Sequence, residues 1–385
     1  MTIGSAALID EADKATASGN LNRAEQLLRQ ACEGATNDPS IFLKLAALQR
    51  ANGRLQQALN SVHRALAISP LDFTALLLRA SLLDRMSDPS APEAWSHAIA
   101  QKPHGELPPH LEGVVATAMA RVDQWTAKRD ARIAVAMEKY ERSANPDEHW
   151  RLQRFRSNVL RRTRPYHSEP THFHFPALEE REFYPRHLFP WMDKLEGATE
   201  IITSELKALM ASDAAELVPY VQYADHLPLD QWRELNKNQD WSAIHLLQNG
   251  EVVEANARFC PRTMDVLEQC NQPKIRGASP NAMFSLLAPK THIPAHVGVN
   301  NTRLVCHLPL VVPEGCWFRV GAERRSWETG KAFVFDDTIE HEADNPTEQL
   351  RVVFIFDTWQ PQLSSLERDA VRCLIEADGL PGDYS

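Results

Sequence analysis

The first hundred residues repeat with a period of 34 residues. Small residues recur at this spacing, as Gly19 and Gly53, Ala24 and Ala58, and Ala31 and Ala65. A proline closes each successive unit, at Pro39, Pro70 and Pro103. Alanines let two helices approach closely, glycine permits the turn between them, and proline ends the second helix. The period therefore predicts stacked pairs of antiparallel helices.

This pattern resembles three tetratricopeptide repeats over roughly residues 5–103. The third unit is looser, with Ala94 and Ala98 at the repeated alanine positions and an inserted turn at residues 87–90. A plain helical bundle is the alternative, but the coincident spacings favour the repeats. The resemblance implies a surface that binds peptides or protein partners and carries no chemistry of its own.

Charge and cysteine content limit the possible classes of protein. The net charge of -10 and the pI of about 5.9 argue against nucleic acid as the main partner, because phosphate binding needs a basic face. We expect no secretory signal and no membrane span, because no basic start with an apolar run and no long apolar stretch is visible. The six cysteines are sparse and form no C-x-x-C pair, so we expect reduced thiols in a cytoplasmic protein.

A second organisation begins after Pro108 and Pro109. Apolar spacing predicts a helix from about Leu111 to Glu141. Six arginines follow between residues 151 and 164. They could bind phosphate, but a solvated helix lying against an acidic neighbour is the favoured interpretation. We therefore divide the chain into repeats (1–105), a helical linker (106–175) and a second folded domain (176–385).

The last hundred residues change from helical to strand periodicity. The predicted strands are 282–287, 302–312, 316–320, 332–335 and 350–356, and turns rich in Pro, Gly and Glu separate them. Several short strands at close spacing predict a sandwich or barrel. Histidines and acidic residues lie among these strands, and Arg351 follows His341 by ten residues.

Two histidines and an arginine in a barrel are the groups that a 2-oxoglutarate-dependent oxygenase requires. Imidazoles bind Fe(II) and leave coordination positions for 2-oxoglutarate and O₂. A guanidinium offers a planar, two-pronged donor for the distal carboxylate of 2-oxoglutarate. The candidate histidines are His292, His296, His307 and His341, and Arg351 is the candidate arginine.

The same residues lie in motifs that resemble the aspartyl/asparaginyl β-hydroxylases. The matching segments are Thr291–Gly298, Arg303–Leu308, Trp327–Lys331, Phe335–Glu342 and, after Arg351, Asp357–Pro361. The resemblance covers roughly residues 180–365 and is most specific in its last part. It implies a double-stranded β-helix (a jelly-roll, cupin-like fold) after the helical repeats, and animal members of the family also carry such repeats.

The resemblance implies a role for each matching residue. His296 and His341 would bind Fe(II), and Ser285 and Arg351 would hold the distal carboxylate of 2-oxoglutarate. His307 would contact the keto-acid end of the co-substrate. The family lacks a carboxylate ligand two residues after the first histidine, and Gly298 stands there. Two acidic residues, Asp336 and Asp337, could orient His341.

One position departs from the family pattern. The animal enzyme has an arginine two residues before the third histidine, and this chain has Val305. Alternation places Arg303 on the same strand face, so we predict that Arg303 supplies a compensating contact to the co-substrate.

The predicted function is hydroxylation of the β-carbon of Asp or Asn in a peptide or protein, with Fe(II), 2-oxoglutarate and O₂. The repeats would help to present that substrate. Two alternatives stay open. One is a related oxygenase that hydroxylates a lipid or small molecule, and the other is a non-catalytic adaptor with a degenerate barrel, which Val305 would favour.

Overall fold

The structure is a computed structural model and describes residues 5–33, 37–105, 107–212, 217–224, 226 and 229–378. The chain folds into two compact units, Met1–Arg154 and Phe155–Ser385. Their border falls inside residues 106–175, the segment expected to link two domains. Each unit is described by itself.

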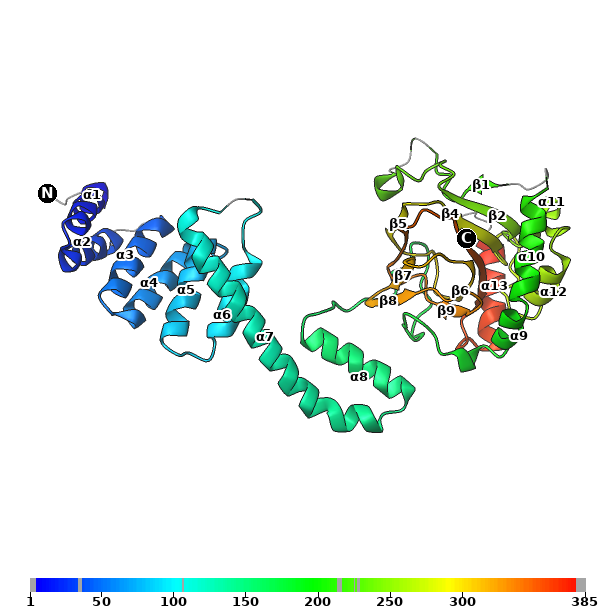
Figure 1. The fold of residues 1–385 in the computed structure, drawn as a ribbon, viewed down its shortest axis with the longest axis horizontal. Helices are drawn as coiled ribbons and strands as arrows, with labels where there is room; N and C mark the ends of the chain where they lie inside the picture. Colours follow the sequence, from blue (N-terminus) through cyan, green and yellow to red (C-terminus); the bar gives the residue numbers. More distant parts are fainter. Residues whose placement is uncertain are drawn as a thin grey trace. The chain divides into compact units, whose positions relative to one another are not determined.

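Helix pairs build the start of the first unit (Figure 1). They are α1 (Ser5–Ala17) with α2 (Leu21–Glu33), α3 (Pro39–Ala51) with α4 (Leu55–Ile68), and α5 (Phe73–Arg85) with α6 (Ala91–Ala100). The first helices of successive pairs begin at residues 5, 39 and 73, which reproduces the 34-residue period. The prediction of all-α repeats is confirmed.

Alanines and caps explain why these helices form and stack. The helix contacts bury small side chains completely, at Ala24, Ala46, Ala58, Ala65, Ala80 and Ala98. Asp38 and Asp72 cap α3 and α5, because each carboxylate accepts a hydrogen bond from a backbone N–H of the first turn. Buried Glu25 accepts hydrogen bonds from Asn52, Arg29 and Arg54, and so ties the first pair to the second.

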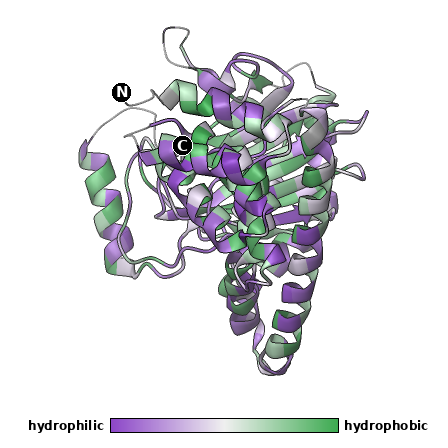
Figure 2. Ribbon diagram, turned by 90° about the vertical axis from the view of Figure 1, so that its left-hand side faces the viewer, coloured by the Kyte–Doolittle hydropathy of each residue, from purple (hydrophilic) through white to green (hydrophobic). Residues whose placement is uncertain are grey.

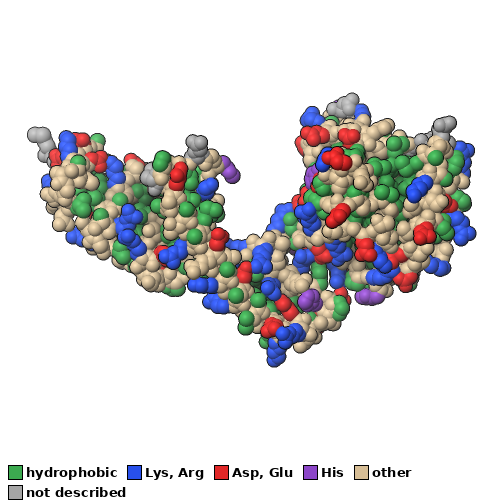
Figure 3. Space-filling view, in the orientation of Figure 1, with side chains coloured by type: hydrophobic (Ala, Val, Ile, Leu, Met, Phe, Trp, Pro, Cys, Tyr) green, Lys and Arg blue, Asp and Glu red, His purple; other side chains and the backbone are tan. Residues whose placement is uncertain are grey.

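A long helix, α7 (Pro109–Ser143), follows the repeats and confirms the helix predicted from Leu111 to Glu141. Val115 and Ala118 in its first part are buried against the repeats. The next helix, α8 (Pro146–Val159), buries none of its residues. Figure 2 shows helices that carry both hydrophilic and hydrophobic residues, and Figure 3 shows acidic and basic side chains mixed over the visible surface. Over the described ranges, none of the helices is long and apolar enough to cross a membrane.

Two antiparallel sheets form the second unit. The large sheet has the order β1-β2-β4-β11-β6-β9, with β3 beside β2, and the small sheet has the order β5-β10-β7-β8. The strands are β1 (Val218–Pro219), β2 (Trp241–Gln248), β3 (Glu251–Val252), β4 (Ala282–Leu287), β5 (Thr291–His296), β6 (Arg303–Val311), β7 (Trp317–Val320), β8 (Glu323–Ser326), β9 (Phe333–Phe335), β10 (His341–Asn345) and β11 (Arg351–Trp359). All five predicted strands are present, so the predicted β domain is confirmed.

The two faces of the large sheet pack against different partners. One face carries Phe284, Leu304 and Phe354, and lies against α9 (Met192–Gly197), α10 (Thr199–Met210) and α12 (Pro261–Leu267). The other face meets residues of the small sheet, such as Phe318, in a second core. Strand alternation assigns Ser285, His307 and Arg351 to that second face, since their sequence neighbours belong to the helix-covered core.

Short helices complete the unit. They are α11 (Glu254–Ala257), α13 (Ser365–Asp378) and the 3₁₀ turns η1 (Arg186–Leu188) and η2 (Asp230–Trp232). Helix α13 packs through Val371 and Ile375 on Trp359 at the end of β11. Trp359 lies on the face of the large sheet opposite the α9–α12 core, because its neighbour Thr358 pairs with Leu304 of that core. The interior between the two sheets holds the apolar second core and the polar residues described next.

Candidate active site

The histidines His296 and His341 face each other in the small sheet. His296 ends β5, His341 begins β10, and the two are paired residues of the antiparallel ladder. Their ring centroids lie 4.0 Å apart. A β-bulge between His341 and Ala343 shifts the register next to the pair. The predicted metal-binding residues are therefore brought together by strand pairing.

Both imidazoles are held in the same way. Nδ1 of His296 lies 2.7 Å from the carbonyl oxygen of Pro294, and Nδ1 of His341 lies 3.1 Å from that of Ile339. A carbonyl oxygen only accepts, so each Nδ1 must carry the proton and each Nε2 keeps a lone pair. Burial is the main cause that lowers the pKa of His296 to about 3 and that of His341 to about 4. Both rings are therefore neutral at pH 7, as metal ligation requires.

The expectation that an aspartate carboxylate orients His341 was wrong. The carbonyl of Ile339 does so, and the carboxylates have other partners. Asp336 accepts from the backbone N–H of Thr338 at 3.0 Å, and burial raises the pKa of Asp336 to about 7. Asp337 forms a buried ion pair with Arg303, with 3.0 Å between Oδ2 and Nη1.

Asp337 fills the space that a side chain at Gly298 would take. A Cβ placed on Gly298 would lie 2.2 Å from Oδ2 of Asp337, and the Gly298 N–H donates to the Asp337 carbonyl at 2.6 Å. Oδ1 of Asp337 is buried and has no hydrogen-bond partner among the described residues. The negative charge of Asp337 also acts on His296. A carboxylate thus lies close to the histidine pair, although it comes from the β9–β10 turn and not from the position two residues after His296.

His296 and His341 are the candidate metal ligands, and no group of three or more His, Cys, Asp or Glu residues in the described ranges is arranged to hold a metal. Two imidazole nitrogens suit Fe, Zn, Cu or Ni, and leave several positions for other ligands. The sequence predicted this two-histidine arrangement.

Arg351 is a buried cation without a carboxylate partner. Its side chain is 2% exposed, and no carboxylate within the described ranges forms an ion pair with it. Burial lowers the pKa of Arg351 to about 10, so the guanidinium remains charged at pH 7. Ser285 lies diagonally across from Arg351 on the same face, because Ser285 pairs with Val353 of β11. The Ser285 hydroxyl accepts from the indole N–H of Trp241 at 3.1 Å and keeps its own O–H to donate.

His307 lies in a box of aromatic rings beside Arg351. The rings of Phe318, Trp327, Phe333 and Phe335 lie 4.8–5.5 Å from it, centroid to centroid. Burial, and then the charge of Arg351, keep the pKa of His307 well below its usual range. Its Nδ1 is buried, and no partner for it exists in the described parts of the chain. The imidazole is therefore neutral and has a free polar atom.

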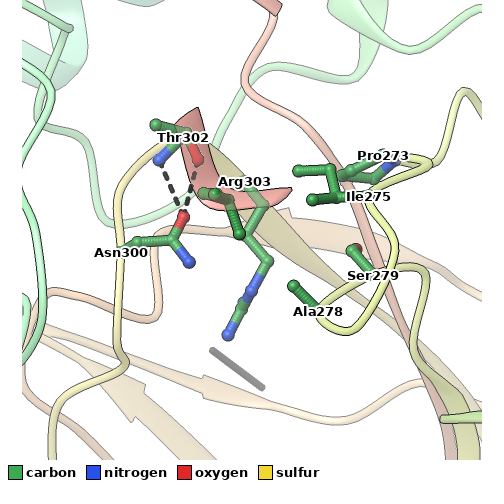
Figure 4. A pocket seen from close by; sticks show the side chains of 8 residues that line it. Pro273, Ile275, Ala278, Ser279, Asn300, Thr302 and Arg303 are labelled. Atoms are coloured by element: carbon green, nitrogen blue, oxygen red, sulfur yellow. Dashed lines mark hydrogen bonds between the residues drawn. The ribbon is translucent and has the colours of Figure 1, made fainter. Parts of the chain in front are cut away.

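Arg303 lies near Tyr220 and His341, and its side chain is already paired with a carboxylate. Figure 4 shows its side chain running from β6 past Asn300, Ala278 and Ser279. The void beside it has a volume of about 10 Å³, which is room for at most a single water. The ion pair with Asp337 uses part of its donor capacity. Its predicted contact with the co-substrate stays a prediction.

Sequence reasoning missed an aromatic wall beside His296. The ring of Trp232 lies 4.9 Å from that of His296, and Tyr220 stacks on Trp241 at 3.9 Å. Tyr220 and Trp232 come from residues 217–240, where the short strand β1 and the turn η2 leave no strong periodicity. The only sequence feature that could have indicated this wall was the aromatic content of the segment.

Comparison with known proteins shows which family these residues are similar to. Residues 196–361 match the sequence model of the family described as "Aspartyl/Asparaginyl beta-hydroxylase". The chain is 32% identical over 213 residues to the aspartyl/asparaginyl beta-hydroxylase of Mus musculus, and the match covers 52% of this chain and 28% of the mouse protein. It is also 32% identical over 197 residues to the "Ornithine lipid ester-linked acyl 2-hydroxylase" of Rhizobium tropici, covering 50% of this chain and 66% of that protein. The chain thus spans less than a third of the mouse relative.

Solved structures similar to this chain match about a third of it. The Yersinia enterocolitica type III secretion chaperone SycD aligns with a TM-score of 0.29 at 17% identity, covering 32% of this chain and 92% of SycD. The Sgt2 TPR domain of Aspergillus fumigatus aligns with a TM-score of 0.28 at 23% identity, covering 32% of this chain and 82% of that domain.

Proposed function

Because residues 196–361 match the aspartyl/asparaginyl β-hydroxylase family, we propose that the chain is an Fe(II)- and 2-oxoglutarate-dependent oxygenase. The match supports the hydroxylase family, and the cofactor dependence is our proposal. Its localisation in the cytoplasm is likewise a proposal, which the six free cysteines support.

The buried guanidinium of Arg351 is the observation that carries the proposal. A buried charge is costly unless an opposite charge compensates it. Since no carboxylate of the described residues pairs with Arg351, a carboxylate of a ligand is the natural partner. Ser285 offers an O–H donor next to it. This donor pair fits one end of a dicarboxylate, and the histidine pair fits a metal that binds the other end.

The residues also fit Fe(II). His296 and His341 would hold it through Nε2, and the unpartnered Oδ1 of Asp337 would supply a hydrogen-bond acceptor near the pair. Fe(II) with 2-oxoglutarate and O₂ supplies the oxidising power to hydroxylate an unactivated C–H bond, with succinate and CO₂ as by-products. The protein orients the co-substrate through Arg351 and Ser285, and its aromatic box around His307 excludes water.

The β-carbon of Asp or Asn in a peptide or protein is the proposed substrate. The family match supports the reaction, and the helical repeats offer a surface for a protein partner. The adaptor alternative is less favoured, because His296, His341 and Arg351 are all present and placed in one interior.

A lipid acyl chain is the second candidate substrate, and the aromatic wall favours it. Trp232, Trp241 and Tyr220 lie beside His296, the imidazole nearest to them. The neighbouring Arg303 is already paired with Asp337, which weakens its attraction for the carboxylate of a substrate aspartate. An apolar chain would gain from contact with these rings.

The test is to load the purified full chain with Fe(II) and measure succinate formed from 2-oxoglutarate. Proteins and lipids from cells with and without the active chain would be compared by mass spectrometry for a 16 Da increment. An increment on Asp or Asn supports the first candidate, and an increment on an acyl chain supports the second. A chain that binds neither Fe(II) nor 2-oxoglutarate would contradict the oxygenase proposal.

A further inference from the structure

Trp327 is a half-buried aromatic residue beside His307 and Arg351 to which the proposed function gives no role. It lies just after β8, at the start of the loop to β9, and so connects the small sheet to the large one. Its indole Nε1 is buried and has no hydrogen-bond partner in the described portion of the chain. A buried N–H without an acceptor costs ~1–3 kcal/mol, so such a group calls for a ligand or a water.

The indole contacts both groups that form the anion end of the site. Its ring is stacked on the imidazole of His307, with 5.5 Å between centroids and 13° between planes. Cζ of Arg351 lies over the same ring at 5.4 Å from its centroid. A cation over an indole face is attracted to it, and stacking fixes the plane of the imidazole. Trp327 therefore holds the Arg351 and His307 side chains in place.

Three side chains around this point have a hydrogen-bond donor to spare. Arg351 has its guanidinium N–H groups, Ser285 its O–H and Trp327 its indole N–H, and His307 has a free Nδ1. Trp241 is already satisfied, because its N–H bonds to Ser285. Three donors around one point, one of them a guanidinium, suit an anion with several acceptor oxygens. A carboxylate that meets Arg351 has oxygens to spare for a further donor.

We infer that the indole N–H of Trp327 is a further hydrogen-bond donor to the distal carboxylate of the co-substrate and that its ring clamps Arg351. This inference rests on the proposed function, since it assigns a residue to the 2-oxoglutarate site. It makes Trp327 a binding residue for the co-substrate and gives no role in metal binding, which belongs to His296 and His341.

The test is calorimetry of 2-oxoglutarate binding to the full chain with Mn²⁺ in place of Fe(II), so that no turnover occurs. The variant Trp327→Phe keeps an aromatic ring and loses the N–H. A lost hydrogen bond to a charged group corresponds to ~10- to 100-fold weaker binding of 2-oxoglutarate. Trp327→Leu should weaken binding further, because it also removes the ring from Arg351. Mn²⁺ binding measured alone should be unchanged in both variants.

Two controls separate a contact to the ligand from a structural effect. Trp317→Phe removes an indole N–H that bonds to Asp344 on the outer side of the small sheet, and it should leave 2-oxoglutarate binding unchanged. Pyruvate is a 2-oxo acid that lacks the distal carboxylate, so Trp327→Phe should bind it as the unchanged chain does. Equal loss for both acids would overturn the inference, as would unchanged 2-oxoglutarate binding in Trp327→Phe. If the unchanged chain fails to bind 2-oxoglutarate at all, the proposed function itself falls.

Discussion

Replacing Arg351 by methionine should stabilise the co-substrate-free protein while removing co-substrate binding. Burial lowers the pKa of Arg351 from its ordinary value of 12.5 to about 10. At ~1.36 kcal/mol per pKa unit, that change corresponds to ~3 kcal/mol of cost for keeping the charge in the fold. The folded pKa is the lower one, so the charged form is disfavoured by folding, and this cost is fully present at any pH below about 10. Neutral pH therefore shows the whole effect.

The free energy of unfolding should rise by less than this ~3 kcal/mol, because the substitution also removes the contact between the guanidinium and Trp327. That contact contributes ~0.5–2 kcal/mol. We expect a gain of ~1–3 kcal/mol in the free energy of unfolding, which is a rise of ~2–10 °C in the Tm of a unit of this size. Methionine has a similar length and fits an apolar neighbourhood, so little space is left empty.

The assay is thermal unfolding of both chains with and without 2-oxoglutarate and Mn²⁺. The co-substrate should raise the Tm of the unchanged chain, because a ligand that binds only the folded state stabilises it, and should leave Arg351→Met unmoved. Arg319→Met is the matched control: Arg319 is paired with Glu340 and Glu342, so its loss should destabilise the protein. An Arg351→Met chain less stable than the original without co-substrate would refute the reasoning, because it would reveal a structural partner for Arg351.

Other predictions concern the metal ligands, the close approach at Gly298 and the repeats. His341→Ala should abolish Mn²⁺ binding and succinate formation with an unchanged far-UV circular dichroism spectrum, and retained turnover would remove His341 from the metal site. Gly298→Ala should destabilise the second unit by ~2–5 kcal/mol in urea unfolding, because its Cβ would lie 2.2 Å from Oδ2 of Asp337 and disturb a buried ion pair; an unaffected midpoint would contradict the close approach. Burial raises the pKa of Glu25, but hydrogen bonds from its three partners outweigh this and lower it overall. The stability that Glu25 contributes is therefore present above its unfolded pKa of ~4.3 and lost as the pH falls through the lower folded value, and Glu25→Gln should flatten this dependence in circular dichroism at 222 nm.

The sequence predicted the parts of the fold that follow from local periodicity. The 34-residue spacing of glycine and alanine predicted the helix pairs, and the runs rich in Val, Leu, Phe and Ile predicted the five strands in the last hundred residues. These patterns repeat along the chain, so they can be recognised from the sequence without knowledge of tertiary contacts. The sequence did not predict β1, β2, β3, β5, β8 and β10. Two residues, as in β1 and β3, do not establish a period, and β5 and β10 carry histidine, proline or acidic residues where the predicted strands have an apolar run.

The finer geometry of the site could not be predicted, because it depends on contacts across strands. The register that pairs His296 with His341 is shifted by a bulge, and no local pattern marks a bulge. The partner of Arg303 proved to be Asp337, 34 residues away on another turn. The sequence indicated that both aspartates were near His341, but only the folded chain shows that Ile339 orients the imidazole.

Side chains alternate between the two faces of the large sheet, and this explains how one domain can bury unpaired polar groups and remain folded. The face toward the helices buries Phe284, Phe354 and Phe356 at no more than 1% exposure, and each such ring contributes ~1.5–3 kcal/mol. The opposite face of the same strands carries Arg351 and His307, whose burial without partners costs free energy. Because successive residues of a strand point to opposite faces, β6 and β11 serve both purposes at once. The apolar face offsets the free-energy cost of the polar face. Substitutions on the helix side should therefore lower stability without changing co-substrate affinity, whereas substitutions on the polar side should weaken co-substrate binding without lowering stability.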